Sequence, residues 1–200
     1  MTIVCNDPDI VFIHVPKTGG TSISKWLMEN APGCKSNTVK TFYSKHYPYF
    51  LFDDEHKKYF SFGIVRNPWE RMVSMFFDII NRIDPGRYEE SDFNNAIRAI
   101  KNNNGLTPLV GKRLSSGPIV EMLKINGKIR CDKYIKVSSL ERELSDIKDK
   151  TLFKGSLKKA NAGKKREHYS KYYEDDTIKI IEDLFKEDIL FFNFKFEDRR

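Results

Sequence analysis

The sequence predicts an α/β fold: a three-layer sandwich in which helices cover both faces of a central parallel sheet. Short apolar, β-branched runs alternate along the chain with segments of helical periodicity, as expected where strands and helices follow one another. Two of these runs end in a tight turn that opens a helix, and a strand, a turn and a helix make half of a βαβ unit. Such units build parallel sheets whose ligands bind at the carboxyl ends of the strands.

The first of these units occupies residues 10–33. The run IVFIHV at 10–15, bounded by Pro16, predicts a buried strand. From Gly20 onward, the sequence TSISKWLMEN carries apolar residues at helical spacing, and Pro32 with the glycine that follows it closes the helix. The stretch HVPKTGGTS therefore lies where a strand runs into a helix.

Two further units follow. FSFGIV at 60–65 predicts a strand, RNP a turn, and WERMVSMFFDII a helix that Pro68 opens at its first turn. YIKVSSL at 134–140 predicts a third strand, which leads into the helical run LERELSDI. Residues 84–118 are richer in Asn, Gly and Pro, and NNNG at 102–105 predicts a loop.

The C-terminal part begins with the basic stretch KKANAGKKREHYSKYY at 158–173. An amphipathic helix is predicted at TIKIIEDLFKEDI, residues 177–189, and the aromatic tail LFFNFKF follows it. The chain has 200 residues, of which 40% are hydrophobic. That length suits one core and is too short for two, so we predict a single domain over residues 1–200.

Composition limits the classes of function. Lys+Arg 35 against Asp+Glu 28 gives a formal net charge of +7, which favours a nucleotide, nucleic acid, acidic polysaccharide or lipid headgroup as partner. Cys5, Cys34 and Cys131 lie far apart with no C-x-x-C pair, so we expect free thiols in a reducing compartment rather than zinc or disulfides. No leader and no apolar run of membrane-spanning length is present, which predicts a soluble, cytoplasmic protein.

HVPKTGGTS at 14–22 has the character of an anion site. A loop of small residues at a helix start directs backbone N–H groups inward, and the helix dipole adds positive potential, so a phosphate or sulfate fits there. Gly19 and Gly20 permit close approach and unusual dihedrals. Three hydroxyls add donors: Thr18, Thr21 and Ser22. The loop is P-loop-like in position, but Lys17 precedes the glycines, whereas the kinase P-loop G-x-x-x-x-G-K-[ST] places its lysine late.

PKTGGTS after an apolar strand resembles the 5′-phosphosulfate loop of sulfotransferases that use 3′-phosphoadenosine 5′-phosphosulfate (PAPS). IVRNPWERMVS at 64–74 is similar to that family's 3′-phosphate motif, an Arg at a strand end followed by a Ser on the next helix, here Arg66 and Ser74. YIKVSSLERELSDI and HYSKYYEDDTIKIIEDLFKEDILFF look like closing segments of the carbohydrate-type, Golgi-related branch. The resemblance covers most of the chain and is weakest over residues 82–130.

The resemblance implies a PAPS-dependent sulfotransferase with a role for each motif. The amides of residues 17–22 would hold the 5′-phosphate, and the Lys17 ammonium would neutralise charge that grows on the bridging oxygen as the sulfuryl group leaves. Arg66 would offer a bidentate fork to the 3′-phosphate that distinguishes PAPS from adenosine 5′-phosphosulfate, and Ser74 would donate one further bond. No metal is required.

An acceptor hydroxyl that attacks sulfur in line requires a general base. His46 in SKHYPYF is the candidate, because carbohydrate sulfotransferases place a base between the two motifs. His14 and His56 are rivals, although we expect His14 to pack beside the loop; His168 is expected to be structural or to contact substrate. Three basic residues could close over the 3′-phosphate: Lys164, Lys165 and Arg166. The G-x-x-G-x-x-K signature of the family's cytosolic branch is missing there, so the third phosphate contact stays open.

The resemblance implies a hydroxyl on a carbohydrate as acceptor, with a small alcohol, a lipid-linked sugar or a protein tyrosine left open. Golgi relatives carry an N-terminal membrane anchor, whereas this chain begins almost at its first strand, so we expect a soluble enzyme of bacterial or viral type. A P-loop-type nucleotide kinase is an alternative that the early lysine argues against. A nucleic-acid-binding module ranks last, because basic and acidic residues intermix along most of the chain.

Overall fold

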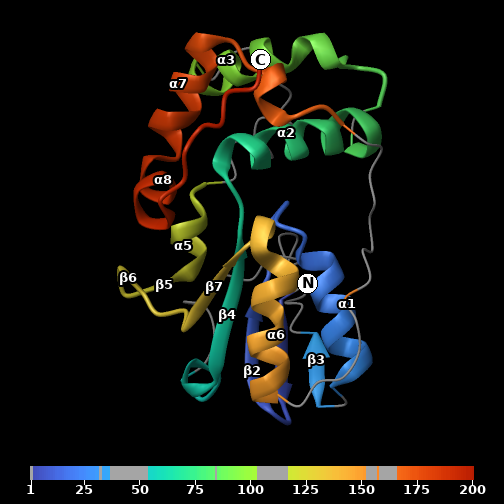
Figure 1. The fold of residues 1–200 in the computed structure, drawn as a ribbon, viewed down its shortest axis with the longest axis vertical. Helices are drawn as coiled ribbons and strands as arrows, with labels where there is room; N and C mark the ends of the chain where they lie inside the picture. Colours follow the sequence, from blue (N-terminus) through green and yellow to red (C-terminus); the bar gives the residue numbers. More distant parts are fainter. Residues whose placement is uncertain are drawn as a thin grey trace. The chain divides into compact units, whose positions relative to one another are not determined.

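The computed structural model describes residues 2–31, 33–36, 54–83, 85–102, 117–151, 157 and 166–200. The chain divides into two compact units (Figure 1). Unit 1 comprises Met1–Arg66 and Ile119–Gly163, and unit 2 comprises Asn67–Pro118 and Lys164–Arg200. Each unit has its own core of buried apolar side chains. The organisation of the chain as one domain stays a prediction.

Unit 1 is built on a five-stranded sheet (Figure 1). In order across the sheet, its strands are β3 (Cys34–Ser36), β1 (Ile3–Asn6), β2 (Asp9–Ile13), β4 (Phe60–Val65) and β7 (Lys133–Lys136). β2 pairs with β4, and β4 with β7, in parallel; β1 pairs with β2 and with β3 in antiparallel fashion. Four strands therefore run in one direction and β1 runs against them. The α/β prediction is confirmed as a mixed fold with a mostly parallel central sheet.

Strand β1 is the departure from the predicted all-parallel sheet. Only Asp7 and Pro8 connect it to β2, with a cis peptide bond between them. A parallel crossover needs a dozen or more residues, so this connection can form only a hairpin. The prediction for residues 10–15 missed β1 and placed the end of the first strand two residues beyond the observed end of β2 at Ile13.

Helices contact both faces of the sheet. Residues two apart on a strand share a face, and the face that carries Phe12, Ile64 and Ile135 packs against α1 (Gly20–Asn30) and α6 (Leu140–Thr151). These helices contribute five side chains to that core: Ile23, Trp26, Leu27, Leu144 and Ile147. On the opposite face lies α5 (Ile119–Leu123), whose Leu123 Cδ2 would be 3.0 Å from a Cβ added at Gly63. The smaller elements of unit 1 are the hairpin β5 (Lys124–Ile125) and β6 (Lys128–Ile129) and 3-10 turns at His56–Lys58 and Val137–Ser139.

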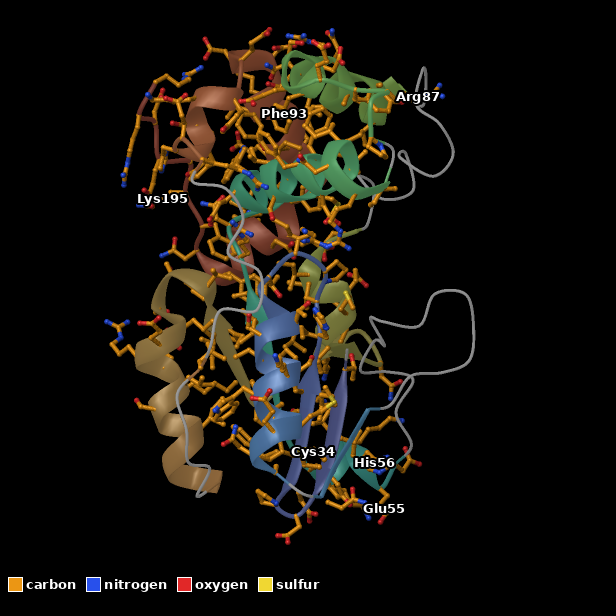
Figure 2. All side chains as sticks on the ribbon, turned by 90° about the vertical axis from the view of Figure 1, so that its right-hand side faces the viewer. Cys34, Glu55, His56, Arg87, Phe93 and Lys195 are labelled. Atoms are coloured by element: carbon orange, nitrogen blue, oxygen red, sulfur yellow. A yellow bond between two sulfur atoms is a disulfide. The ribbon has the colours of Figure 1, made fainter. Side chains whose placement is uncertain are left out.

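Unit 2 consists of helices around an aromatic core. Its elements are α2 (Pro68–Asp78), a π-helical turn (Ile79–Ile83), 3-10 turns at Glu90–Asp92 and Tyr169–Tyr172, α3 (Phe93–Asn102), α7 (Asp175–Leu184) and α8 (Lys186–Phe192). Phe93 (Figure 2) is buried in this core and meets the rings of Phe76 and Tyr173 edge to face. One prediction needs correction: Phe185 divides the single helix predicted at 177–189 into α7 and α8. Of the predicted loop at 102–105, Asn102 is the last residue of α3, and residues 103–105 lie outside the described residues.

A disulfide joins Cys5 of β1 to Cys34 of β3 (Cys34 is labelled in Figure 2). The two residues face each other in the antiparallel register of these strands. The expectation of free thiols is therefore wrong for this pair, because 29 positions separate the two cysteines in sequence and only the return of the chain from α1 into β3 brings them together. Cys131 is a free cysteine, and its burial raises the pKa of its thiol to about 12.

Thiol chemistry should distinguish the three cysteines. In the native oxidised protein a thiol reagent at mildly alkaline pH should react slowly, because Cys131 is half-buried and its raised pKa keeps it protonated. Unfolding without reductant should expose one reactive thiol per chain, and reduction should expose the other two. Reduction should also lower the free energy of unfolding by about 3 kcal/mol, because the unfolded chain is then no longer restricted by a link between two cysteines 29 positions apart. Thiol titration and urea denaturation measure these effects; three reactive thiols before reduction would contradict the disulfide.

Candidate functional site

The loop between β2 and α1 has an unusual backbone. Lys17 and Gly19 both adopt the left-handed region, with φ of 64° and 80°. Glycine enters this region readily, whereas lysine does so rarely and only where the surrounding structure requires it. Residues 16–19 are therefore a tightly specified turn that carries the chain from β2 to the start of α1 at Gly20.

Thr18 holds this loop from the inside. Its side chain is fully buried, and its hydroxyl donates to the carbonyl oxygen of Val15 at 2.9 Å. A hydroxyl has a single proton, so the proton that Thr18 was predicted to donate to an anion is used within the loop. A contact between Thr18 and an anion would therefore come from its backbone amide.

The amino end of α1 has the electrostatics of an anion site. Its N-cap residue is Gly19, and the first turn contains no acidic residue. The first N–H groups of a helix lack partners within the helix and carry the positive end of its dipole. Thr21 is exposed here, and Ser22 is half-buried with its N–H bonded to the Gly19 carbonyl at 3.1 Å. An anion at this end would be attracted by the positive end of the helix dipole, and no carboxylate in the first turn would repel it.

Arg66 follows β4 directly and reaches the same loop. Its Nη1 donates to the carbonyl oxygen of Lys17 at 3.1 Å. Because β2 and β4 are parallel, with Ile13 opposite Gly63, their carboxyl ends lie at one edge of the sheet and the residues that follow each strand meet. Unit 1 therefore brings together Lys17 of the first motif and Arg66 of the second, which are 49 positions apart.

In unit 2 the second motif continues into α2. Asn67 caps this helix, since its Oδ1 accepts from the Trp69 N–H at 3.1 Å, and Pro68 stands in the first turn. The amide of Asn67 also donates to the carbonyl oxygen of Lys195 at 2.8 Å (Lys195 is labelled in Figure 2). Ser74 lies on α2 and is half-buried. The sequence interpretation did not single out Asn67, although an Asn directly before Pro is a typical helix start.

The remaining predicted site residues are distributed as follows. His46, Lys164 and Lys165 lie outside the described residues. Arg166 is an exposed residue of unit 2, and its guanidinium lies 4.3 Å from the centre of the Phe77 ring, which is a cation–π distance. The described part of the chain therefore assigns Arg166 an aromatic contact.

The three described histidines have different surroundings. His14 is 5% exposed and packs against Gly20 of the loop, which confirms the prediction for it. His56 opens a 3-10 turn and meets the Tyr59 ring edge to face (Figure 2). His168 caps a 3-10 turn: its Nδ1 accepts from the Ser170 N–H at 3.4 Å and lies 2.9 Å from the Ser170 hydroxyl. His168 thus has the structural role that was one of its two predicted roles.

The residues that the structure describes carry no features of a metal site or of a membrane span. Within those ranges, no three His, Cys, Asp or Glu side chains are grouped so that they could hold a metal ion. Across the same part of the chain, no helix combines the length and the apolar character needed to cross a membrane.

Residues 1–109 match a family model described as the sulfotransferase family, and this match covers more than half of the 200 residues. The chain belongs to the sulfotransferase family. The matched segment of this sulfotransferase contains the loop with Lys17, Arg66 and Ser74, whereas the closing segments that resemble the carbohydrate branch lie beyond it. No curated protein and no solved structure matches the chain. Members of the family transfer sulfuryl groups, generally from PAPS, to hydroxyl-bearing acceptors.

Replacement of Thr18 by valine should destabilise the loop. Valine has nearly the same shape but no hydroxyl, so the buried bond to the Val15 carbonyl is lost, which should lower the free energy of unfolding by about 1–2 kcal/mol. Urea denaturation measures this change. Thr21→Val is the matched control, because Thr21 is exposed and its change should stay within about 0.5 kcal/mol. Equal stability of Thr18→Val and the wild type would show that this bond contributes little.

Proposed function

We propose that this chain transfers the sulfuryl group of PAPS to an acceptor hydroxyl on a carbohydrate. The observation that carries the proposal is the bond from Arg66 Nη1 to the Lys17 carbonyl. It brings together two motifs whose proposed ligands, the 5′-phosphosulfate and the 3′-phosphate, are parts of one molecule. Their position at the carboxyl ends of neighbouring parallel strands is the usual position of a ligand site in an α/β sheet.

The loop and the start of α1 suit the 5′ side of PAPS. The amides of residues 17–22 are proposed to hold the 5′-phosphate as a P-loop-like cradle, with Thr21 and Ser22 adding hydroxyl donors. Gly19 is exposed, and a Cβ added to it would meet no described atom within 4 Å, so the loop has open space on this side. The carboxylate-free first turn of α1 supports the binding of an anion there.

Lys17 is proposed to act on the leaving group. PAPS supplies an activated sulfuryl group whose bond to the bridging oxygen breaks during transfer. The ammonium of Lys17 would donate a hydrogen bond to that oxygen as negative charge grows on it, and such preorganised donors lower barriers by several kcal/mol. The left-handed backbone of Lys17 and the bond that its carbonyl accepts from Arg66 limit the positions that its side chain can reach.

Arg66 and Ser74 are proposed to bind the 3′-phosphate. A guanidinium carries five N–H donors in a planar fork that suits bidentate binding of a phosphate, and the bond of Arg66 to the Lys17 carbonyl places this fork beside the loop. Three residues in the C-terminal basic stretch are proposed to add charge around the same phosphate: Lys164, Lys165 and Arg166.

His46 is proposed as the general base that takes the proton of the acceptor hydroxyl. An imidazole has an ordinary pKa near 6.5, which suits proton abstraction at neutral pH. His14 and His56 are the rivals. The burial of His14 and its packing against Gly20 favour a packing role for it, which leaves His56 as the main alternative.

Calorimetry with 3′-phosphoadenosine 5′-phosphate (PAP) tests the donor proposal. The wild type should bind PAP, and Arg66→Ala should weaken binding by about ten- to a hundredfold, because a charge-assisted hydrogen bond contributes about 1.5–3 kcal/mol. Arg130→Ala is the matched control, because it also removes one positive charge from unit 1. Arg130 is exposed and precedes β7, so it lies near the amino ends of the parallel strands, whereas Arg66 lies at their carboxyl ends. The absence of heat with the wild type, or equal affinities for wild type and Arg66→Ala, would contradict the proposal.

Steady-state rates with labelled PAPS and a panel of sugars test the catalytic roles. Lys17→Ala should lower kcat at least about a hundredfold with a smaller effect on PAP affinity, because the loss of a transition-state donor acts mainly on kcat. His46→Ala should lower kcat by about the same factor, whereas His56→Ala should not. Full activity in both Lys17→Ala and His46→Ala, with the fold intact, would show that these role assignments are wrong.

A further inference from the structure

The two adjacent glycines of the loop are required for different physical reasons. Gly19 has φ of 80°, and a Cβ added to it would meet no described atom within 4 Å, so glycine is needed there for its backbone conformation. Gly20 is the first residue of α1 and does not adopt the left-handed region. A Cβ added to Gly20 would lie 2.2 Å from Cδ2, 2.5 Å from Nε2 and 2.9 Å from Cγ of His14. Glycine is needed at this position for space, and the imidazole of His14 occupies that space.

The ring of His14 is itself held in place by its neighbours. The backbone N–H of His14 donates to the hydroxyl of Thr2 at 3.1 Å, and Thr2 is buried. The ring stacks on Phe12, with centroids 5.9 Å apart and planes inclined by 25°, and Phe12 is fully buried. Close-packed interiors have little room for such a ring to shift. His14 is therefore a rigid spacer between the end of β2 and the first residue of α1.

We propose that His14 is a positioning residue of the anion loop. Gly20 rests against its imidazole, and this contact fixes the direction of the amide N–H groups at the start of α1. The inference rests on the proposed function, since those N–H groups affect turnover only if they hold the 5′-phosphate of the donor. A general base must reach the proton of the acceptor hydroxyl, and a ring that is 5% exposed and covered by Gly20 is built instead to support the loop.

A double-mutant cycle between His14 and Gly20 tests this contact. Gly20→Ala in the wild-type background should weaken PAP binding by at least about tenfold and lower the urea midpoint, because the new methyl group collides with the ring. In the His14→Ala background the methyl group has room, so the same substitution should weaken PAP binding by less than about threefold; residues in contact are expected to be non-additive in this way.

Gly19→Ala is the matched control for the cycle. Its penalty comes from the positive φ and not from a collision, so it should be the same, within about twofold, in the wild-type and His14→Ala backgrounds. We therefore expect the effect of a substitution to depend on His14 at Gly20 but not at Gly19.

A conservative variant separates positioning from proton transfer. His14→Asn keeps atoms near the Cγ and Cδ2 positions that face Gly20 but has no titratable nitrogen. If His14 positions the loop, His14→Asn should retain kcat/KM for PAPS within about tenfold of the wild type, and His14→Ala should lose more of it, mainly through a higher KM for PAPS. If His14 were the base, both variants would lose kcat equally and the inference would be overturned.

The failure of this inference can be told apart from the failure of the proposed function. If PAP binds to the wild type and Gly20→Ala has the same effect in both backgrounds, the inference is wrong and the proposed function stands. If the wild type binds no PAP, the proposed function is wrong and the positioning role falls with it. In that case, non-additive changes of the urea midpoint in the same double-mutant cycle would show that the His14–Gly20 contact contributes to packing alone.

Discussion

The parallel pairing of β2 with β4 is the constraint on which the candidate site depends. With Ile13 opposite Gly63, the loop after β2 and Arg66 after β4 emerge at the same edge of the sheet, and one hydrogen bond to the Lys17 carbonyl joins them. A slip of this pairing by two residues would keep each side chain on its face but move Arg66 by about 7 Å. A shift of that size would break the hydrogen bond to the Lys17 carbonyl. The buried core fixes the strand register, and it therefore also fixes the position of Arg66 beside the loop.

The loop itself is constrained from three independent directions. Thr18 ties it from the inside to the Val15 carbonyl, Gly19 supplies a backbone conformation that side chains disfavour, and His14 lies against Gly20. None of these contacts uses the outer side of the loop, where the first N–H groups of α1 would meet an anion. Sites whose supporting shell is fixed in this way need little reorganisation when charge develops.

The sequence predicted the local parts of this structure well and the long-range parts poorly. β4 was placed at its observed limits, Phe60–Val65, because a strand buried on both faces forms a continuous apolar run. The start of α1 was placed at Gly20, since Pro and Gly mark such boundaries. The edge strand β3 and the Cys5–Cys34 bond were missed, because they depend on register between distant segments. For the same reason the motifs around Lys17 and around Arg66 were found separately, while the bond between them was not.

At the junction between β4 and α2, the short second motif gives two neighbouring side chains different, well-defined partners. Arg66 and Asn67 are neighbours, yet the side chain of Arg66 bonds to the loop of unit 1 and the side chain of Asn67 caps α2 and binds the Lys195 carbonyl in unit 2. Pro68 then fixes the first turn of the helix. Within unit 1, Arg66 directly follows β4, which is held by its parallel pairing with β2. A long side chain on a held backbone loses less conformational entropy when it binds than it would on a mobile loop. The proposed role of this guanidinium, the recognition of one phosphate, would benefit from that preorganisation more than from any additional charge nearby.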